Sequence, residues 1–222
     1  MIKISLNKEL DYEVYTDFWD FSMAGANFGE KIKKDHPNIN LENYKKYIDD
    51  FYVKNQSELL EKQNEINKLL ISKQNNFITE LKNIFDIDFS NKTYNGYLSI
   101  FNCNPRYLDT ETFQIYFKKD LLDMLEVAFH ESLHFSFFEY LSKHFSEKIQ
   151  KFDKNSGILW ELSEIINVII LNLPPFIKIL EREEMLFYPE LKEKLDKAKK
   201  IWVSSKNIKD FINTYLDTNS KS

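Results

Sequence analysis

The chain has 222 residues, a formal net charge of −5 and 43% hydrophobic residues. This composition suits one folded domain and excludes a disordered chain, and the acidic balance gives no overall basic surface for nucleic acid. The single cysteine, Cys103, excludes an internal disulfide and predicts a reducing compartment. The residues after Met1 lack the apolar segment of a signal peptide, and no segment reaches the roughly 20 apolar residues of a membrane span, so we expect a cytoplasmic protein that does not bind membranes.

The first 90 residues predict one strand and two amphipathic helices. Apolar and polar residues alternate over 2–6, which indicates a short strand. The segment 17–29 is aromatic and then rich in small residues, but it matches neither the dinucleotide nor the P-loop pattern, so we expect an ordinary turn or loose helix. Asn40 can cap a helix over 41–53, and Ser57 can cap a second, longer helix with one apolar stripe.

Two further strands are predicted before the most apolar part of the chain. The segment 94–102 has strand character and is ended by Pro105. The segment 112–118 alternates strictly, which places Phe113, Ile115 and Phe117 on one inward face. We interpret this second strand as the edge of a small sheet.

A His-Glu-x-x-His motif stands inside the long apolar run that follows. His130 and His134 are four residues apart, so on a helix they share one face and can offer two imidazole nitrogens to one metal ion. Glu131 lies about 100° further round the helix, where it can reach a water molecule on that metal without being a ligand. Asp120 can cap this helix at its start. The arrangement is the one that metal-assisted hydrolysis needs.

The surroundings of the motif favour a metal over two buried structural histidines. From Leu121 to about Leu141 the helix is apolar nearly all round, which predicts that it is buried. Burying two histidines and a glutamate there costs several kcal/mol unless something compensates them, and a metal ion would do so.

A second apolar helix, 158–171, carries the candidates for the third ligand. Glu164, Glu161 and Asn167 are spaced by three residues and share a face. Because the rest of this helix is apolar, its carboxylates are expected to face something positive. The polar segment 142–157 predicts a loop before it, and two prolines end it.

Closing amphipathic helices are predicted over 190–201 and 207–216.

Two other residues are candidates for the third ligand besides the glutamates. His144 does not fit a metzincin site, since Phe137 and Tyr140 occupy the positions of that motif's glycine and third histidine. Cys103 would suit a peptide-deformylase-like site, but the glycine-rich segments of that family are missing.

The order of strand, His-Glu-x-x-His helix, loop and glutamate-bearing helix resembles the gluzincin group of zinc peptidases. The matching residues are His130, Glu131, His134 and a glutamate within 159–167, and the resemblance covers roughly 112–171. The spacer before that glutamate is longer than is usual in the group. We expect Glu164 to be the third ligand, because the Ser-Glu frame is closer to the group's Asn-Glu frame, with Glu161 as the alternative.

The resemblance implies a zinc metallopeptidase acting on a peptide or protein. Zn²⁺ would be held by two histidines and Glu164, and Glu131 would serve as general base. In that group a sheet edge pairs with extended substrate, a role that the strand near 113–117 would take here. Tyr188, Tyr140 and Arg106 are candidates for the donor that stabilises the oxyanion.

We therefore predict an α+β fold that is mostly helical, with a small antiparallel sheet beside the active-site helix. One zincin-like domain would span 1–222, with a mainly helical part over 1–90 and the metal-site core and closing helices over 91–222. Two other functions stay open. One is a non-catalytic interaction protein stabilised by its metal, and the other is a metal-dependent amidase acting on amides that are not peptides.

Overall fold

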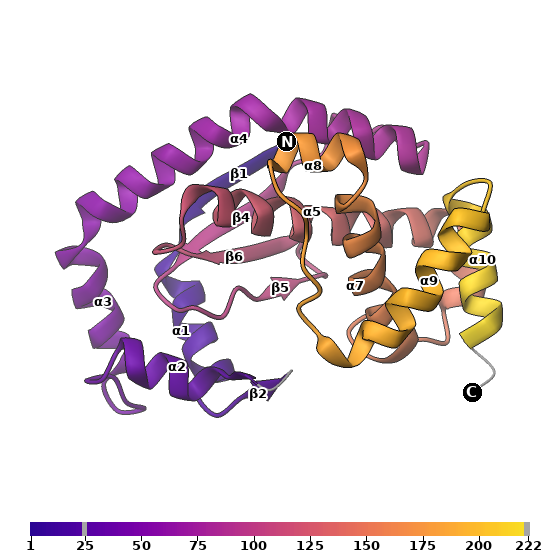
Figure 1. Cartoon of the computed structure of the whole chain (residues 1–222). Coiled ribbons are helices and arrows are strands. Elements are labelled where there is room, and N and C mark those ends of the chain that lie inside the picture. The colour runs from indigo at the N-terminus through magenta and orange to yellow at the C-terminus, as the bar shows by residue number, and fades with distance from the viewer. Residues whose placement is uncertain (24–25, 220–222) are drawn as a thin grey trace. The chain divides into compact units, whose positions relative to one another are not determined.

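Helices make up most of the chain, and a four-stranded sheet is built from its first 116 residues (Figure 1). The computed structural model describes residues 1–23 and 26–219. The predicted α+β, mostly helical class is confirmed. The chain divides into two compact units, Met1–Asn75 with Lys92–Ser132 and Asn76–Asn91 with Leu133–Ser222.

The sheet belongs to the first unit and has the order β1-β4-β6-β5 (Figure 1). Its strands are β1 (Ile2–Leu6), β4 (Tyr94–Ser99), β6 (Thr112–Tyr116) and β5 (Arg106–Tyr107). β1 pairs with β4 and β4 with β6 in parallel, whereas β5 pairs with β6 in the antiparallel direction. The sheet is therefore mixed, and the prediction of an antiparallel sheet was wrong. Alternating residues indicate which face of a strand is buried, but they do not specify the direction of its partner.

β6 lies inside the sheet, so the prediction that it forms an edge was also wrong. One side pairs with β4, and the other side is covered by the chain around β5. Gln114 donates its backbone N–H to the carbonyl of Pro105 at 2.9 Å. Tyr116 donates its N–H to Oδ1 of Asn104 at 2.9 Å. The backbone N–H groups of Gln114 and Tyr116 are therefore already paired within the chain and not open to a peptide substrate.

The opposite edge of the sheet, β1, is covered by side chains of the long helix α4 (Gln56–Phe85). Asn67 accepts the N–H of Ile4 at 2.9 Å and donates to the carbonyl of Ile4 at 2.7 Å. Gln74, two turns later on the same face of α4, accepts the N–H of Ile2 at 2.7 Å. These amides satisfy backbone groups that an edge strand would otherwise present to another chain.

Gly96 in β4 allows its two neighbouring strands to place large side chains close together. It stands opposite Ile4 in β1 and Phe113 in β6. A Cβ atom at this position would lie 2.5 Å from the side chain of Ile4 and 2.6 Å from the ring of Phe113. Phe113, Ile115 and Phe117 are all buried, as the alternation predicted.

The first helix, α1 (Lys8–Phe18), has no counterpart in the sequence predictions. It is fixed to the sheet by Asp11, whose carboxylate is fully buried. Ser99 donates its hydroxyl to this carboxylate at 2.5 Å, Tyr52 donates at 2.8 Å and the N–H of Ile100 donates at 3.1 Å. A single carboxylate thus connects α1, the end of β4 and the helix that carries Tyr52.

Two of the predicted helix starts need correction. The helix predicted over 41–53 is α3 (Tyr44–Lys54), because the Asn40 side chain accepts the N–H groups of Glu42 and Asn43 and holds a turn before it. The longer helix α4 begins one residue before Ser57, which is therefore not its cap. The segment 17–29 holds the end of α1, β2 (Ser22–Met23), β3 (Ala26–Asn27) and the start of α2 (Phe28–Asp35), and its residues 24 and 25 lie outside the described part.

The second unit is helical. Its elements after α5 (Leu121–His144) are α6 (Ser146–Ile149), α7 (Gly157–Leu171), α8 (Pro174–Leu180), the 3₁₀ turn η1 (Pro189–Leu191), α9 (Lys192–Ser204) and α10 (Ile208–Asn219). The helix predicted over 158–171 and both closing helices are confirmed. The polar segment predicted as a loop contains α6, and the two prolines that end α7 also begin α8.

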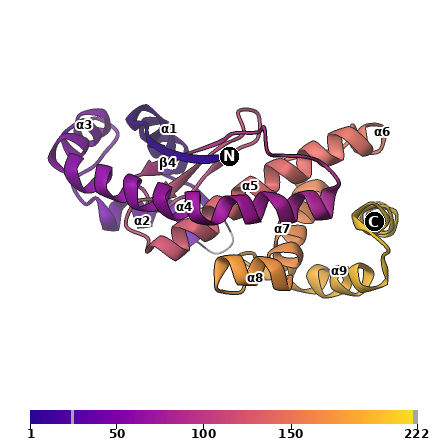
Figure 2. The same cartoon turned by 90° about the horizontal axis from the view of Figure 1, so that it is seen from above.

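A sharp bend separates α7 from α8 (Figure 2). Among the described residues, no single helix is long and apolar enough to cross a membrane. Taken together, α7 and α8 have the length and apolar composition of a membrane span, but the two helices are bent by 82° at the break between them. Eleven of the fifteen residues of α7 are buried inside the protein.

Candidate metal centre

Helix α5 presents the His-Glu-x-x-His motif, and both its start and its burial agree with the sequence prediction. Asp120 accepts the N–H of Asp123 at 2.8 Å, which is the contact of a helix N-cap. The helix is buried nearly all round. Its fully buried apolar residues include Leu125, Phe129, Leu133, Phe137 and Leu141.

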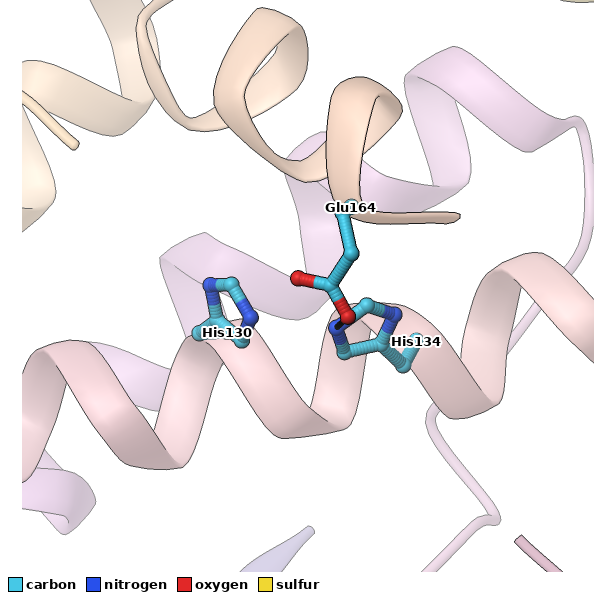
Figure 3. A group of neighbouring side chains, drawn as sticks. All are labelled: His130, His134 and Glu164. Atoms are coloured by element: carbon cyan, nitrogen blue, oxygen red, sulfur yellow. Dashed lines mark ion pairs between the residues drawn. The ribbon is translucent and has the colours of Figure 1, made fainter. Parts of the chain in front are cut away.

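The structure brings His130, His134 and Glu164 together. One ligand atom from each of them lies within 4.8 Å of the other two. His130 and His134 stand one turn apart on α5, and Glu164 extends from α7 toward the two rings (Figure 3). The Nε2 atom of His134 lies 3.4 Å from Oε1 of Glu164, and His134 is completely buried.

This donor set fits a metal ion. Bonds of about 2.0–2.1 Å in a tetrahedral arrangement place two donor atoms roughly 3.3 Å apart. The 3.4 Å between His134 and Glu164 agrees with that spacing, whereas it is long for a direct hydrogen bond. Two imidazole nitrogens and one carboxylate oxygen are also a common protein ligand set of catalytic zinc. These three residues can therefore hold a metal ion.

Glu161, the alternative third ligand, faces a different partner. Lys194 on α9 donates to both carboxylate oxygens of Glu161 at 2.6 Å. Residues three apart on a helix point about 60° apart, so one of these glutamates can face α5 while the other faces α9. The structure thus favours Glu164 over Glu161.

The two other candidate ligands lie outside the group that the described residues form. His144 is exposed near the end of α5, where its ring packs against Tyr140 at 4.6 Å. Cys103 is buried, and this burial raises the pKa of its thiol to about 12.

Glu131, the residue after His130 and the predicted general base, is not a member of the group that His130, His134 and Glu164 form. Its side chain is almost buried and lies near Arg106 of β5. The Nη1 atom of Arg106 is 3.5 Å from Oε2 of Glu131, and their side chains are 12% and 11% exposed. The separation is that of an ion pair rather than of a strong hydrogen bond.

The three candidate oxyanion donors have different surroundings. Arg106 contacts Glu131, as described. Tyr140 is buried, and its ring packs against Phe85 at 5.3 Å. The ring of Tyr188 packs edge-on against the ring of Trp160, with 4.8 Å between their centroids. Trp160 lies on α7, one turn before Glu164. Arg106 was predicted as a possible oxyanion donor. Its contact with Glu131 could not be predicted, because no sequence motif or spacing relates the two residues.

No protein-family model matches this chain, and neither a curated protein nor a solved structure is significantly similar to it. The gluzincin resemblance therefore remains a prediction from the motif and the order of elements. What the structure adds is independent of any relative. It places two histidines and one of two candidate glutamates together, and it places an arginine beside the glutamate of the motif.

Proposed function

We propose that this protein is a zinc-dependent metallopeptidase of the gluzincin type. Zn²⁺ would be held by His130, His134 and Glu164, and Glu131 would be the general base. The observation that carries the proposal is the convergence of three zinc-type donors within 4.8 Å. Glu131, the next residue after His130, supplies a carboxylate beside them.

The number of donors favours a catalytic over a structural zinc. Structural sites close the metal with four protein ligands, whereas catalytic sites use three and leave one position open. The group formed by the described residues has three members. A bound Zn²⁺ supplies Lewis-acid polarisation of a carbonyl oxygen and lowers the pKa of water to about 7.

The protein's own part in the reaction is a proton transfer by Glu131. The side chain of Glu131 leaves α5 about 100° round the helix axis from that of His130. It therefore starts next to a metal ligand but does not point at the metal as the ligands do. There it can accept a proton from the attacking water and deliver it to the leaving amine. Its near burial keeps it out of bulk water, where its hydrogen bonds would be weaker.

Peptide amides are the substrate class that we favour over other amides. The support is the gluzincin-like order of elements around the motif. The interaction-protein alternative has less support, because a purely structural metal needs no carboxylate at the position of Glu131. An amidase would use the same residues in the same roles, so only the substrate separates it from a peptidase.

The Glu131→Gln variant tests the proposal directly. The amide has nearly the same shape but cannot accept a proton, so we expect normal metal content and a loss of peptide hydrolysis of about 10²-fold or more. Metal content is measured by elemental analysis and activity with a library of fluorescence-quenched peptides. Glu139→Gln is the matched control, because Glu139 lies on the side of α5 opposite His130. Undiminished cleavage by zinc-loaded Glu131→Gln protein would reject the base role.

A further inference from the structure

The contact between Arg106 and Glu131 has no part in binding the metal, yet it holds the residue that would move the proton. Both side chains are nearly buried, and their closest charged atoms are 3.5 Å apart. Salt screens a buried ion pair much less than an exposed one. The pair therefore restrains Glu131 even at physiological ionic strength.

The backbone around Arg106 is held firmly. β5 pairs with β6 through Arg106 opposite Phe113 and Tyr107 opposite Thr112. Just before β5, Asn104 has a φ of 47°, a left-handed conformation that asparagine tolerates, and its side chain accepts the N–H of Tyr116. Arg106 is thus carried by a strand of the sheet, whereas Glu131 is carried by helix α5.

A glutamate needs such support to act as a base. Its side chain has three rotatable bonds, and fixing them costs conformational entropy. A misplacement of about 1 Å at a catalytic group can lower the rate by about 10²-fold. The planar guanidinium suits this task, because it restrains a carboxylate in direction as well as in distance.

We propose that Arg106 is a positioning residue that holds the Glu131 carboxylate in the orientation needed for proton transfer. This inference rests on the proposed function, in which Glu131 is the base. Arg106 acts through Glu131 and not on the substrate. Its loss should therefore slow turnover without weakening the binding of substrate or metal.

The first experiment compares Arg106→Met with wild type on a peptide that the wild-type protein cleaves in the library assay. Methionine keeps the apolar stem and removes the charge. We expect kcat to fall at least about 10-fold, with KM within about 3-fold and the zinc content unchanged. Arg182→Met is the matched control for the loss of an arginine charge, because Arg182 is the chain's other arginine.

A second variant keeps the test decisive if Arg106→Met does not fold. Arg106→Lys retains the positive charge but loses the planar fork, so we expect a folded protein whose kcat falls by at least about 3-fold. Wild-type kcat in Arg106→Lys would then contradict the inference. Where both variants fold, Arg106→Lys should be the more active of the two.

A measurement that needs no activity examines the pair itself. Urea unfolding of the zinc-loaded wild type, Arg106→Met, Glu131→Gln and the double variant forms a double-mutant cycle. We expect the two substitutions to be non-additive, with a coupling of at least about 3-fold in the unfolding equilibrium constant. Additive effects would show that the two side chains do not support each other.

The outcomes separate this inference from the proposed function. Full kcat in Arg106→Met beside an inactive Glu131→Gln overturns the positioning role and leaves the peptidase proposal standing. A raised KM with unchanged kcat also overturns it, because Arg106 would then contact the substrate. A wild-type protein that cleaves no peptide, or a fully active Glu131→Gln, overturns the proposed function and the inference together.

Discussion

The choice between Glu161 and Glu164 shows what a single side chain decides at this site. Glu161 and Glu164 are three residues apart on α7, and the sequence motif alone allows either of them to be the third metal ligand. The carboxylate of Glu161 pairs with the ammonium group of Lys194, whereas the carboxylate of Glu164 lies beside Nε2 of His134. Each carboxylate on this apolar helix is thus compensated by a positive or metal-binding partner, as burial requires.

The two histidines should be needed for the metal. We expect about one zinc per chain in the wild type, and loss of it in His130→Ala and His134→Ala, because two donors are too few for a tight site. Elemental analysis after dialysis measures the content. His144→Ala, an exposed histidine near the end of the same helix, should bind zinc normally. Full zinc occupancy in either of the first two variants would rule out this ligand set.

The two glutamates should differ in their effect on zinc affinity. Glu164→Ala removes an anionic ligand and should weaken zinc by more than about 100-fold, above the range typical of outer groups. Glu161→Ala removes only the partly exposed pair with Lys194, so we expect a change below about 10-fold and a loss of stability within about 1 kcal/mol. Titration against a competing chelator compares both variants once circular dichroism shows that they are folded. A larger loss in Glu161→Ala would reverse the assignment.

At the scale of elements, the sequence was most informative where one pattern determines one structure. The apolar run of α5 and the apolar segment of α7 predicted buried helices, and both exist. The alternation of β6 predicted its buried face, but its neighbours depend on residues far away in the chain. α1 was missed because its residues show no clear apolar stripe, and Asp11, the residue that fixes it, is polar.

The start of α5 offers a test at this scale. Asp120→Ala removes the side-chain oxygen that accepts the N–H of Asp123, so we expect a loss of about 1 kcal/mol in the free energy of unfolding. Asp120→Asn keeps an acceptor at the cap and should cost only a few tenths of a kcal/mol. Urea unfolding of the zinc-loaded proteins measures both. Equal stability of the alanine variant and the wild type would show that another group caps the helix.

At the scale of the whole molecule, the sequence predicted the α+β class but not how distant segments are joined. The carboxylate of Asp11 accepts hydrogen bonds from Tyr52, Ser99 and Gln114, which lie 41, 88 and 103 residues away. No local pattern encodes such contacts, because each partner lies on a different element. Burial raises the pKa of Asp11 to about 6, although its hydrogen bonds oppose the shift.

This shift should make stability depend on pH with a definite sign. Between an unfolded pKa of 3.8 and a folded pKa of about 6, the folded state binds more protons at Asp11, so the free energy of unfolding falls as pH rises. The contribution of the protonated group is fully present below about pH 4 and is lost above about pH 6 or 7. Two pKa units correspond to about 3 kcal/mol.

Asp11→Asn isolates this contribution, since asparagine does not titrate. The difference in unfolding free energy, wild type minus Asp11→Asn, should fall by about 3 kcal/mol between pH 4 and pH 7. His36 titrates in the opposite sense, because burial lowers its pKa, but it is present in both proteins and cancels in the difference. The neighbouring Tyr107 and Cys103 do not interfere, because burial raises the pKa of each to about 12. Urea unfolding at several pH values gives the curve, and a flat or rising difference would show that Asp11 is ionised in the folded protein throughout this range.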